Sequence, residues 1–107
     1  MSRFAEVLGR LVSTIESRKG GEVSTSYTAK LLTDPSLAAK KLGEEAVEAV
    51  IAATQGDKDA LAGESADLIY HWLVVLAAAG VSLDEVAAKL EAREGTSGLA
   101  EKASRKP

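Results

Sequence analysis

Hydrophobic side chains recur with the 3.6-residue period of an α-helix along most of the chain. The first such stretch predicts an amphipathic helix over residues 2–18, ended by cations and then by Gly20 and Gly21. A brief second helix is predicted over residues 27–32, closed before Pro35. No segment alternates with the two-residue period of a strand, so the sequence predicts an all-α fold.

Two long helices joined by a very short turn come next. An aspartate N-cap, with proline at the first helical position, opens a helix over residues 35–54. Gln55 and Gly56 break this helix, and Asp57 caps the next one, which spans residues 57–79. Because the turn is so short, we expect the two helices to be antiparallel neighbours.

The C-terminal part contains one more helix signal. Ser82 and Glu85 form a capping-box pattern that opens a short helix ending near Arg93. Residues 95–107 are rich in glycine, serine and lysine and offer little to bury, so we expect a disordered tail. The sequence thus predicts a single helical domain over residues 1–94.

The two long helices carry more apolar side chains than a small monomer would cover. They are Val47, Val50, Ile51, Leu68, Ile69, Leu73, Val74, Val75 and Leu76. We therefore expect an antiparallel helical bundle whose core is completed by homo-oligomerisation, as a homodimer or a homotetramer.

Composition excludes several classes of function. The 107 residues have a formal net charge of −3, which argues against nucleic-acid binding, and no cysteine, which excludes disulfides and zinc–thiolate sites. The apolar run of residues 68–79 is interrupted by His71 and is too short to span a bilayer. No signal-peptide pattern opens the sequence. We expect a cytoplasmic protein with neither a nucleic-acid nor a membrane partner.

Acidic residues cluster on both long helices at matching heights. Glu44, Glu45 and Glu48 share one stripe of the first helix, and Glu64 and Asp67 lie three residues apart on the second. Counted from the turn, Glu48 should face Glu64, and Glu45 should face Asp67. One interpretation is a solvated charged face. The stronger one is a cation site, because four carboxylates converging between helices repel one another without a positive charge.

The ligand types indicate which cation and which chemistry. Oxygen ligands without cysteine favour a hard ion, Mg²⁺ or Mn²⁺. Such an ion keeps positions free for water and for substrate phosphates, which predicts hydrolysis of a nucleotide's phosphoanhydride bond. The predicted metal ligands are Glu45, Glu48, Glu64 and Asp67, and the predicted catalytic set adds Glu44.

Three segments carry a resemblance to a known family. They are SYTAKLL at residues 26–32, KKLGEEAVE at residues 40–48 and ADLIYH at residues 66–71. Together they resemble the phosphoribosyl-ATP pyrophosphatases, within the all-α MazG-type nucleotide pyrophosphohydrolases, over residues 4–93. The resemblance implies a bundle of MazG type and Mg²⁺-dependent hydrolysis of 1-(5-phosphoribosyl)-ATP to 1-(5-phosphoribosyl)-AMP and pyrophosphate in histidine biosynthesis. It also implies that the acidic residues named above carry the metal.

Further polar residues are candidate substrate contacts. Lys40 and Lys41 precede the first carboxylates by one turn, where they are either surface ion-pair partners or contacts to phosphate oxygens. Lys30 is a weaker case of the same kind. Tyr27 and Thr28 follow Ser26 at a helix start, where hydroxyls and free backbone N–H groups can bind phosphate, although plain N-capping by Ser26 is the simpler interpretation. The resemblance is what makes this segment a substrate contact.

The histidine and its aromatic neighbours admit simpler roles. His71 lies four residues after Asp67, so it either orients that carboxylate as a second-shell residue or is a core histidine satisfied by the backbone. Tyr70 and Trp72 are interpreted as core or interface aromatics.

Three alternative functions stay open at this point. A housecleaning pyrophosphatase of the same superfamily, acting on simple (d)NTPs, would share the metal site. A carboxylate di-iron bundle would need Glu-x-x-His pairs on two helices, and this chain has one histidine. A non-enzymatic helical module would use the acidic patch only to recruit a basic partner.

Overall fold

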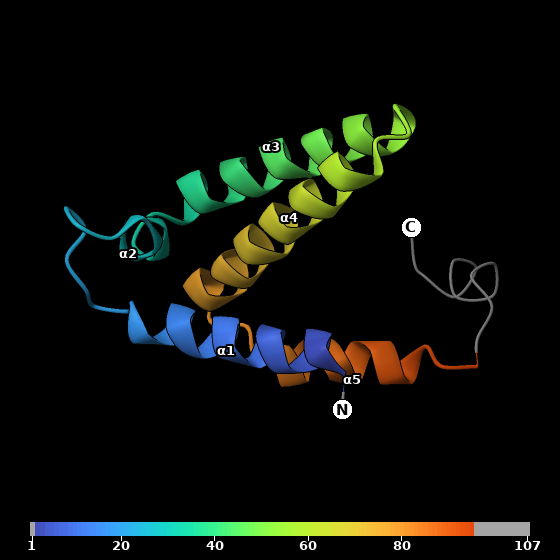
Figure 1. The fold of residues 1–107 in the computed structure, drawn as a ribbon. Helices are drawn as coiled ribbons and strands as arrows, with labels where there is room; N and C mark the ends of the chain where they lie inside the picture. Colours follow the sequence, from blue (N-terminus) through green and yellow to red (C-terminus); the bar gives the residue numbers. More distant parts are fainter. Residues whose placement is uncertain (1, 96–107) are drawn as a thin grey trace, which may run out of the picture.

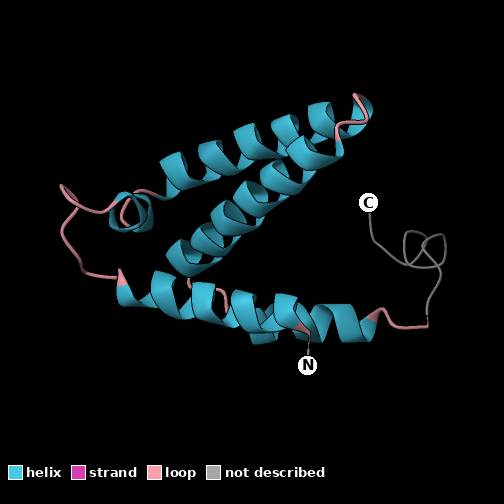
Figure 2. Ribbon diagram, viewed as in Figure 1, coloured by secondary structure: helices cyan, strands magenta, loops and turns pink. Residues whose placement is uncertain are grey.

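The computed structural model describes residues 2–95, and every regular element in that part of the chain is a helix (Figure 2). The helices are α1 (Arg3–Ser17), α2 (Tyr27–Leu32), α3 (Pro35–Thr54), α4 (Lys58–Ala79) and α5 (Leu83–Ala92) (Figure 1). The predicted all-α fold is therefore confirmed, and the predicted helix bounds hold to within one residue or two. The tail that we expected to be disordered lies, apart from Gly95, outside the described residues.

Side-chain caps explain where the helices begin. Each described helix starts after a serine or aspartate whose side chain accepts a hydrogen bond from the backbone N–H three residues on. The predicted capping box is confirmed, because the Ser82 N–H donates to Glu85 Oε2 at 2.7 Å and the Glu85 N–H donates to Ser82 Oγ at 3.1 Å. α4 ends at Gly80, whose φ of 74° is a left-handed conformation that glycine adopts without a Cβ clash.

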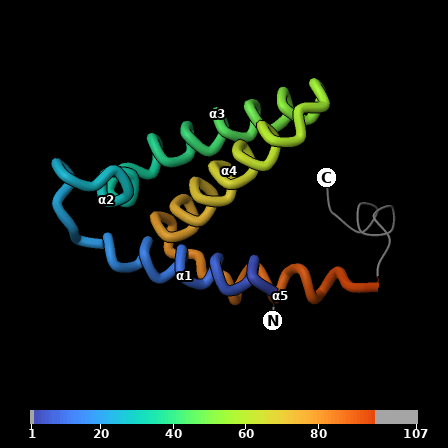
Figure 3. Tube along the Cα trace, in the orientation of Figure 1, coloured from blue at the N-terminus to red at the C-terminus, as the bar shows by residue number. Residues whose placement is uncertain are grey.

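α3 and α4 form the hairpin that the short turn predicted. Gly56, with φ of 70°, turns the chain between them, and the two helices then run antiparallel (Figure 3). They contact each other more extensively than any other pair of described helices. This arrangement brings residues at equal distances from the turn to the same height.

α4 is the central helix. It contacts α1, α2 and α3, and the core lies where these helices meet, with Ile15, Leu31, Ala38, Leu73 and Val74 buried. By length and composition α4 is also the one helix in the described part that would be able to cross a membrane, a property it shares with core helices of folded domains.

The outer face of α3 is apolar and exposed. Val47, Val50 and Ile51 are 58%, 61% and 48% exposed, so the monomer leaves uncovered the three of the nine expected side chains that lie on α3. Those on α4 are buried or partly buried. A second copy covering this face stays a prediction.

Candidate metal centre

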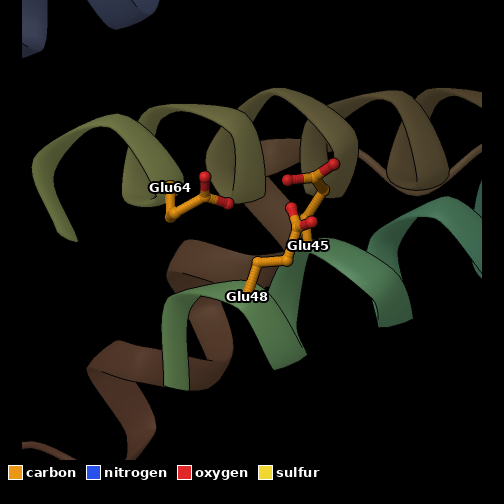
Figure 4. Close-up of side chains that lie close together, drawn as sticks. All are labelled: Glu45, Glu48 and Glu64. Carbon is orange, nitrogen blue, oxygen red and sulfur yellow. The ribbon is translucent and has the colours of Figure 1, made fainter. Parts of the chain in front are cut away.

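Three glutamates meet between α3 and α4. Glu45 and Glu48 come from one face of α3 and Glu64 from the facing side of α4, and their carboxylates point toward one another (Figure 4). One oxygen from each lies within 4.8 Å of those from the other two. The hairpin produces this meeting, because Glu48 and Glu64 both lie eight residues from Gly56.

Two of the carboxylate oxygens in this cluster are buried without a partner. Glu45 Oε2 and Glu64 Oε2 accept no hydrogen bond from any described residue. A buried polar atom without a partner is destabilising, and more so when it is charged. Oxygen atoms from three carboxylates, two of them unsatisfied, are the donor set that a hard divalent cation prefers. The residues therefore fit Mg²⁺ or Mn²⁺.

The pKa values of two members reflect the same crowding. Burial, followed by the charge of Glu48, raises the pKa of Glu45, whereas nearby His71 acts in the opposite direction. Hydrogen bonding with the Glu48 side chain, followed by burial, raises the pKa of Glu64. A hydrogen bond between two carboxyl groups requires a proton on one of them. Without a cation, the cluster thus favours a bound proton over a full set of charges.

The other predicted acidic residues lie at the edge of this cluster. Asp67 is exposed and its charge raises the pKa of both Glu45 and Glu64, yet its carboxylate is not part of the compact group. Glu44 is exposed and its Oε1 lies 3.4 Å from Lys41 Nζ. The expected facing of Glu48 and Glu64 is seen in the cluster, whereas the expected facing of Glu45 and Asp67 brings no Asp67 oxygen into it.

Comparison with known proteins identifies the family. Residues 8–94 match the sequence profile described as "Phosphoribosyl-ATP pyrophosphohydrolase". The chain is 74% identical, over 103 residues and 96% of both chains, to a Caulobacter vibrioides protein named "Phosphoribosyl-ATP pyrophosphatase". Proteins with the same name from Cereibacter sphaeroides and Methylobacterium radiotolerans are 60% and 58% identical, over 92% and 96% of this chain and 97% of their own lengths.

The chain belongs to the phosphoribosyl-ATP pyrophosphohydrolase family. The resemblance carried by the three sequence segments is thereby confirmed. Of its segments, residues 26–32 cap and form α2, which contacts α4, and residues 66–71 lie within α4 itself.

In this family member, α2 reaches α4 one turn beyond Asp67. The Tyr27 hydroxyl lies 3.4 Å from His71 Nε2, and the Thr28 hydroxyl forms a hydrogen bond with the Tyr70 hydroxyl. His71 Nδ1 lies 2.8 Å from the Asp67 backbone oxygen, so the ring is satisfied by the backbone, as one of its two predicted roles required. With both ring nitrogens in contact with other groups, this histidine gives no support to the di-iron alternative.

Tyr70 is the residue whose polar role the sequence did not reveal. Its place among the apolar side chains of α4 predicted a packing role, and no spacing rule points to a hydroxyl partner 42 residues earlier. Only the tertiary contact of α2 with α4 creates that pair.

The lysines and the clefts complete the site. Lys30 and Lys40 are exposed, and Lys41 forms the surface ion pair through its contact with Glu44.

A cleft of about 300 Å³ lies beside Glu48 and Glu64, between α3 and the start of α4. A second cleft, of about 560 Å³, is lined by the loop before α2 and by the first residues of α2. Both clefts are open enough to admit part of a nucleotide.

Proposed function

We propose that this protein hydrolyses 1-(5-phosphoribosyl)-ATP to 1-(5-phosphoribosyl)-AMP and pyrophosphate, as a cytoplasmic enzyme of histidine biosynthesis that requires Mg²⁺ or Mn²⁺. The observation that carries the proposal is the meeting of three carboxylates with two buried, unpartnered oxygens. Membership of the family supports the reaction, and the names of the relatives support the substrate.

The carboxylates are assigned two kinds of task. Glu45, Glu48 and Glu64 would hold the cation, with Asp67 as a further ligand at the exposed side. When bound, such a cation neutralises charge on the phosphate oxygens and orients them. Glu44, exposed beside the cluster, completes the catalytic set.

The hydrolysis itself requires a proton acceptor and a held substrate. The oxygen of a water molecule bonds to phosphorus, the phosphoanhydride P–O bond breaks with its electrons on pyrophosphate, and the water's proton passes to a carboxylate. The chain supplies this acceptor from the same acidic set. Its residues thereby both concentrate negative charge for the cation and accept the proton.

The substrate contacts are assigned to two segments, the start of α2 with its hydroxyl groups and the lysines of α3. Tyr27 and Thr28 at the start of α2 line the second cleft, and Lys30 is exposed on the same helix. Lys40 and Lys41, one turn before the carboxylates, offer positive charge to phosphate oxygens. We thus assign α2 to substrate contact, and α3 to both cation and phosphate contact.

Turnover of phosphoribosyl-ATP in ¹⁸O-labelled water tests this function. We expect phosphoribosyl-AMP and pyrophosphate with Mg²⁺, no products with EDTA, and label in whichever product contains the attacked phosphorus. dCTP and dUTP under the same conditions are the control substrates. Faster turnover of these dNTPs than of phosphoribosyl-ATP would favour the housecleaning alternative, and no turnover of any nucleotide would contradict a hydrolase.

We also propose that a second copy covers the outer face of α3, giving a homodimer or a homotetramer. Val47, Val50 and Ile51 are exposed there, and an apolar hollow of about 340 Å³ on the hairpin is lined by Leu42, Leu68, Ile69 and Trp72. Burial of such side chains is worth about 1.5–3 kcal/mol each, which is enough to drive association when several are covered.

Sedimentation velocity tests this association. The wild-type protein should sediment as a dimer or tetramer, and Val50→Lys should shift it toward the monomer. Ser36→Lys, at the other end of α3, adds the same charge at an exposed position and serves as the control. A wild-type monomer at high concentration would contradict the proposal.

A further inference from the structure

The first turn of α2 is joined to α4 by two side-chain contacts at consecutive positions. The Thr28 hydroxyl bonds to the Tyr70 hydroxyl, and the Tyr27 hydroxyl contacts His71 Nε2. The rings of Tyr27 and His71 also meet edge to face, with centroids 6.1 Å apart, and those of Tyr70 and His71 do so at 4.9 Å. Neighbouring residues of α2 are therefore paired with neighbouring residues of α4.

His71 is itself held in one orientation. A carbonyl oxygen only accepts, so His71 Nδ1–H donates to the Asp67 carbonyl at 2.8 Å. The other ring nitrogen, Nε2, contacts the Tyr27 hydroxyl at 3.4 Å. The ring is only 8% exposed, which keeps water from replacing Tyr27. One side chain thus links the start of α2 to the turn of α4 that carries Asp67.

α2 depends on such contacts because it is short. A helix of six residues has no stability of its own, and its position is set by what it packs against. Ala29 and Leu31 are buried and fix its inner side. Tyr27 is 50% exposed, so apolar burial does not define how the first turn is oriented on α4. The two hydroxyl contacts supply that definition.

We propose that Tyr70 and His71 are positioning residues, which hold Tyr27 and Thr28 in a fixed position against α4 so that the substrate meets a preformed surface. The inference rests on the proposed function, since it assigns α2 to the substrate side of that same site. A preformed binding surface lowers the ordering cost on binding, so its loss weakens the affinity for substrate and spares the chemical step.

A double-mutant cycle separates positioning from direct substrate contact. Tyr70→Phe and Thr28→Val each remove one hydroxyl of the same pair, and each should raise KM about three- to tenfold, with kcat and the Mg²⁺ dependence unchanged. If Tyr70 acts through Thr28, its substitution adds nothing once the Thr28 hydroxyl is gone, and the double variant is no worse than Thr28→Val alone. Additive effects, or an unchanged KM in Tyr70→Phe, would overturn the proposal.

Two further variants serve as controls for the double-mutant cycle. Thr28→Ser keeps the hydroxyl and should retain the wild-type KM. Thr33→Val removes a hydroxyl at the other end of α2 that bonds only within α2, to the Lys30 carbonyl, and should also leave KM unchanged. A Thr28→Ser variant as impaired as Thr28→Val would contradict the role assigned to the hydroxyl pair. A matching cycle with Tyr27→Phe and His71→Gln tests the second contact.

Amide hydrogen exchange gives a readout that does not need turnover. Tyr70→Phe should speed exchange of the α2 amides about three- to tenfold while leaving the α3 and α4 amides protected. Unchanged α2 exchange would overturn the positioning role, even if the protein hydrolysed phosphoribosyl-ATP. Absence of hydrolysis in the wild type, with the exchange effect present, would instead contradict the proposed function alone.

Discussion

Glutamates serve opposite purposes at two places in this chain. At the start of α5, Glu85 is exposed, and its Oε2 accepts the Ser82 backbone N–H at 2.7 Å. Hydrogen bonds from the backbone and side chain of Ser82 lower the pKa of Glu85. Between α3 and α4, Glu45 and Glu64 each have a buried oxygen without a donor, and their pKa values are raised.

The difference shows how partners decide the role of a carboxylate. Glu85 finds its donors inside its own helix start, so its charge stabilises the fold without any added ligand. Glu45 and Glu64 find other carboxylates instead, so their charges oppose folding until a cation neutralises them. The capping box is complete as folded, whereas the cluster is completed by what it binds.

Substitution of the cluster should have the largest effect on rate. Glu45→Gln and Glu48→Gln each remove a charged ligand, and kcat for phosphoribosyl-ATP should fall by at least about 10²-fold. Glu85→Gln is the matched control and should keep wild-type kcat, since its carboxylate contacts only the start of α5. Near wild-type hydrolysis by both cluster variants would place the chemistry elsewhere.

Cation binding should stabilise the fold through the carboxylate cluster and not through the Glu85 capping box. Mg²⁺ or Mn²⁺ at about 100 times its Kd should raise the free energy of unfolding of the wild type by about 2.7 kcal/mol, measured by denaturant titration. Glu85→Gln should show the same gain, and Glu45→Gln should lose most of it. An equal gain in the wild type and Glu45→Gln would mean that the ion binds outside the cluster.

The smallest expected effect is a pair of opposite pH dependences in the metal-free protein. Glu45 and Glu64 have folded-state pKa values above the ordinary 4.5, so the folded state binds more protons and stability falls as the pH rises from 4.5 through those raised values. Glu85 has a folded-state pKa below 4.5, so its contribution is present above 4.5 and is lost as the pH falls through that lower value.

Urea unfolding in EDTA between about pH 3 and about pH 8 measures both slopes. Glu45→Gln should flatten the fall on the neutral side and stabilise the metal-free protein there. Glu85→Gln should flatten only the acid side. A Glu45→Gln variant that is less stable than the wild type at neutral pH would contradict the repulsion assigned to the cluster.

Local signals predicted most of the fold. Single residues mark where helices begin and end. Asp34, Asp57 and Ser82 are N-caps in the structure, and Gly80 is the C-cap of α4. The exposed apolar face of α3 could also be predicted from the sequence, because Val50 and its apolar neighbours recur at helical spacing. The burial of Leu31 was not, because a six-residue helix shows too little periodicity to reveal which side it buries.

The site divides in the same way. The facing of Glu48 and Glu64 follows from counting residues from a tight turn, so spacing alone predicted it. The looser place of Asp67 depends on side-chain exposure, and the Thr28–Tyr70 pair depends on how α2 docks on α4. No spacing of residues in the sequence predicts either feature, since both are set by contacts between segments far apart in the chain.

The central claim, that the three glutamates form a divalent-cation site, is tested most directly by the anomalous diffraction of crystals grown with Mn²⁺. We predict an anomalous peak between α3 and α4, within coordination distance of oxygens from Glu45, Glu48 and Glu64. The Glu85 capping box should show none. Catalytically active crystals at saturating Mn²⁺ with no peak at the cluster, or with the only peak elsewhere, would contradict the claim.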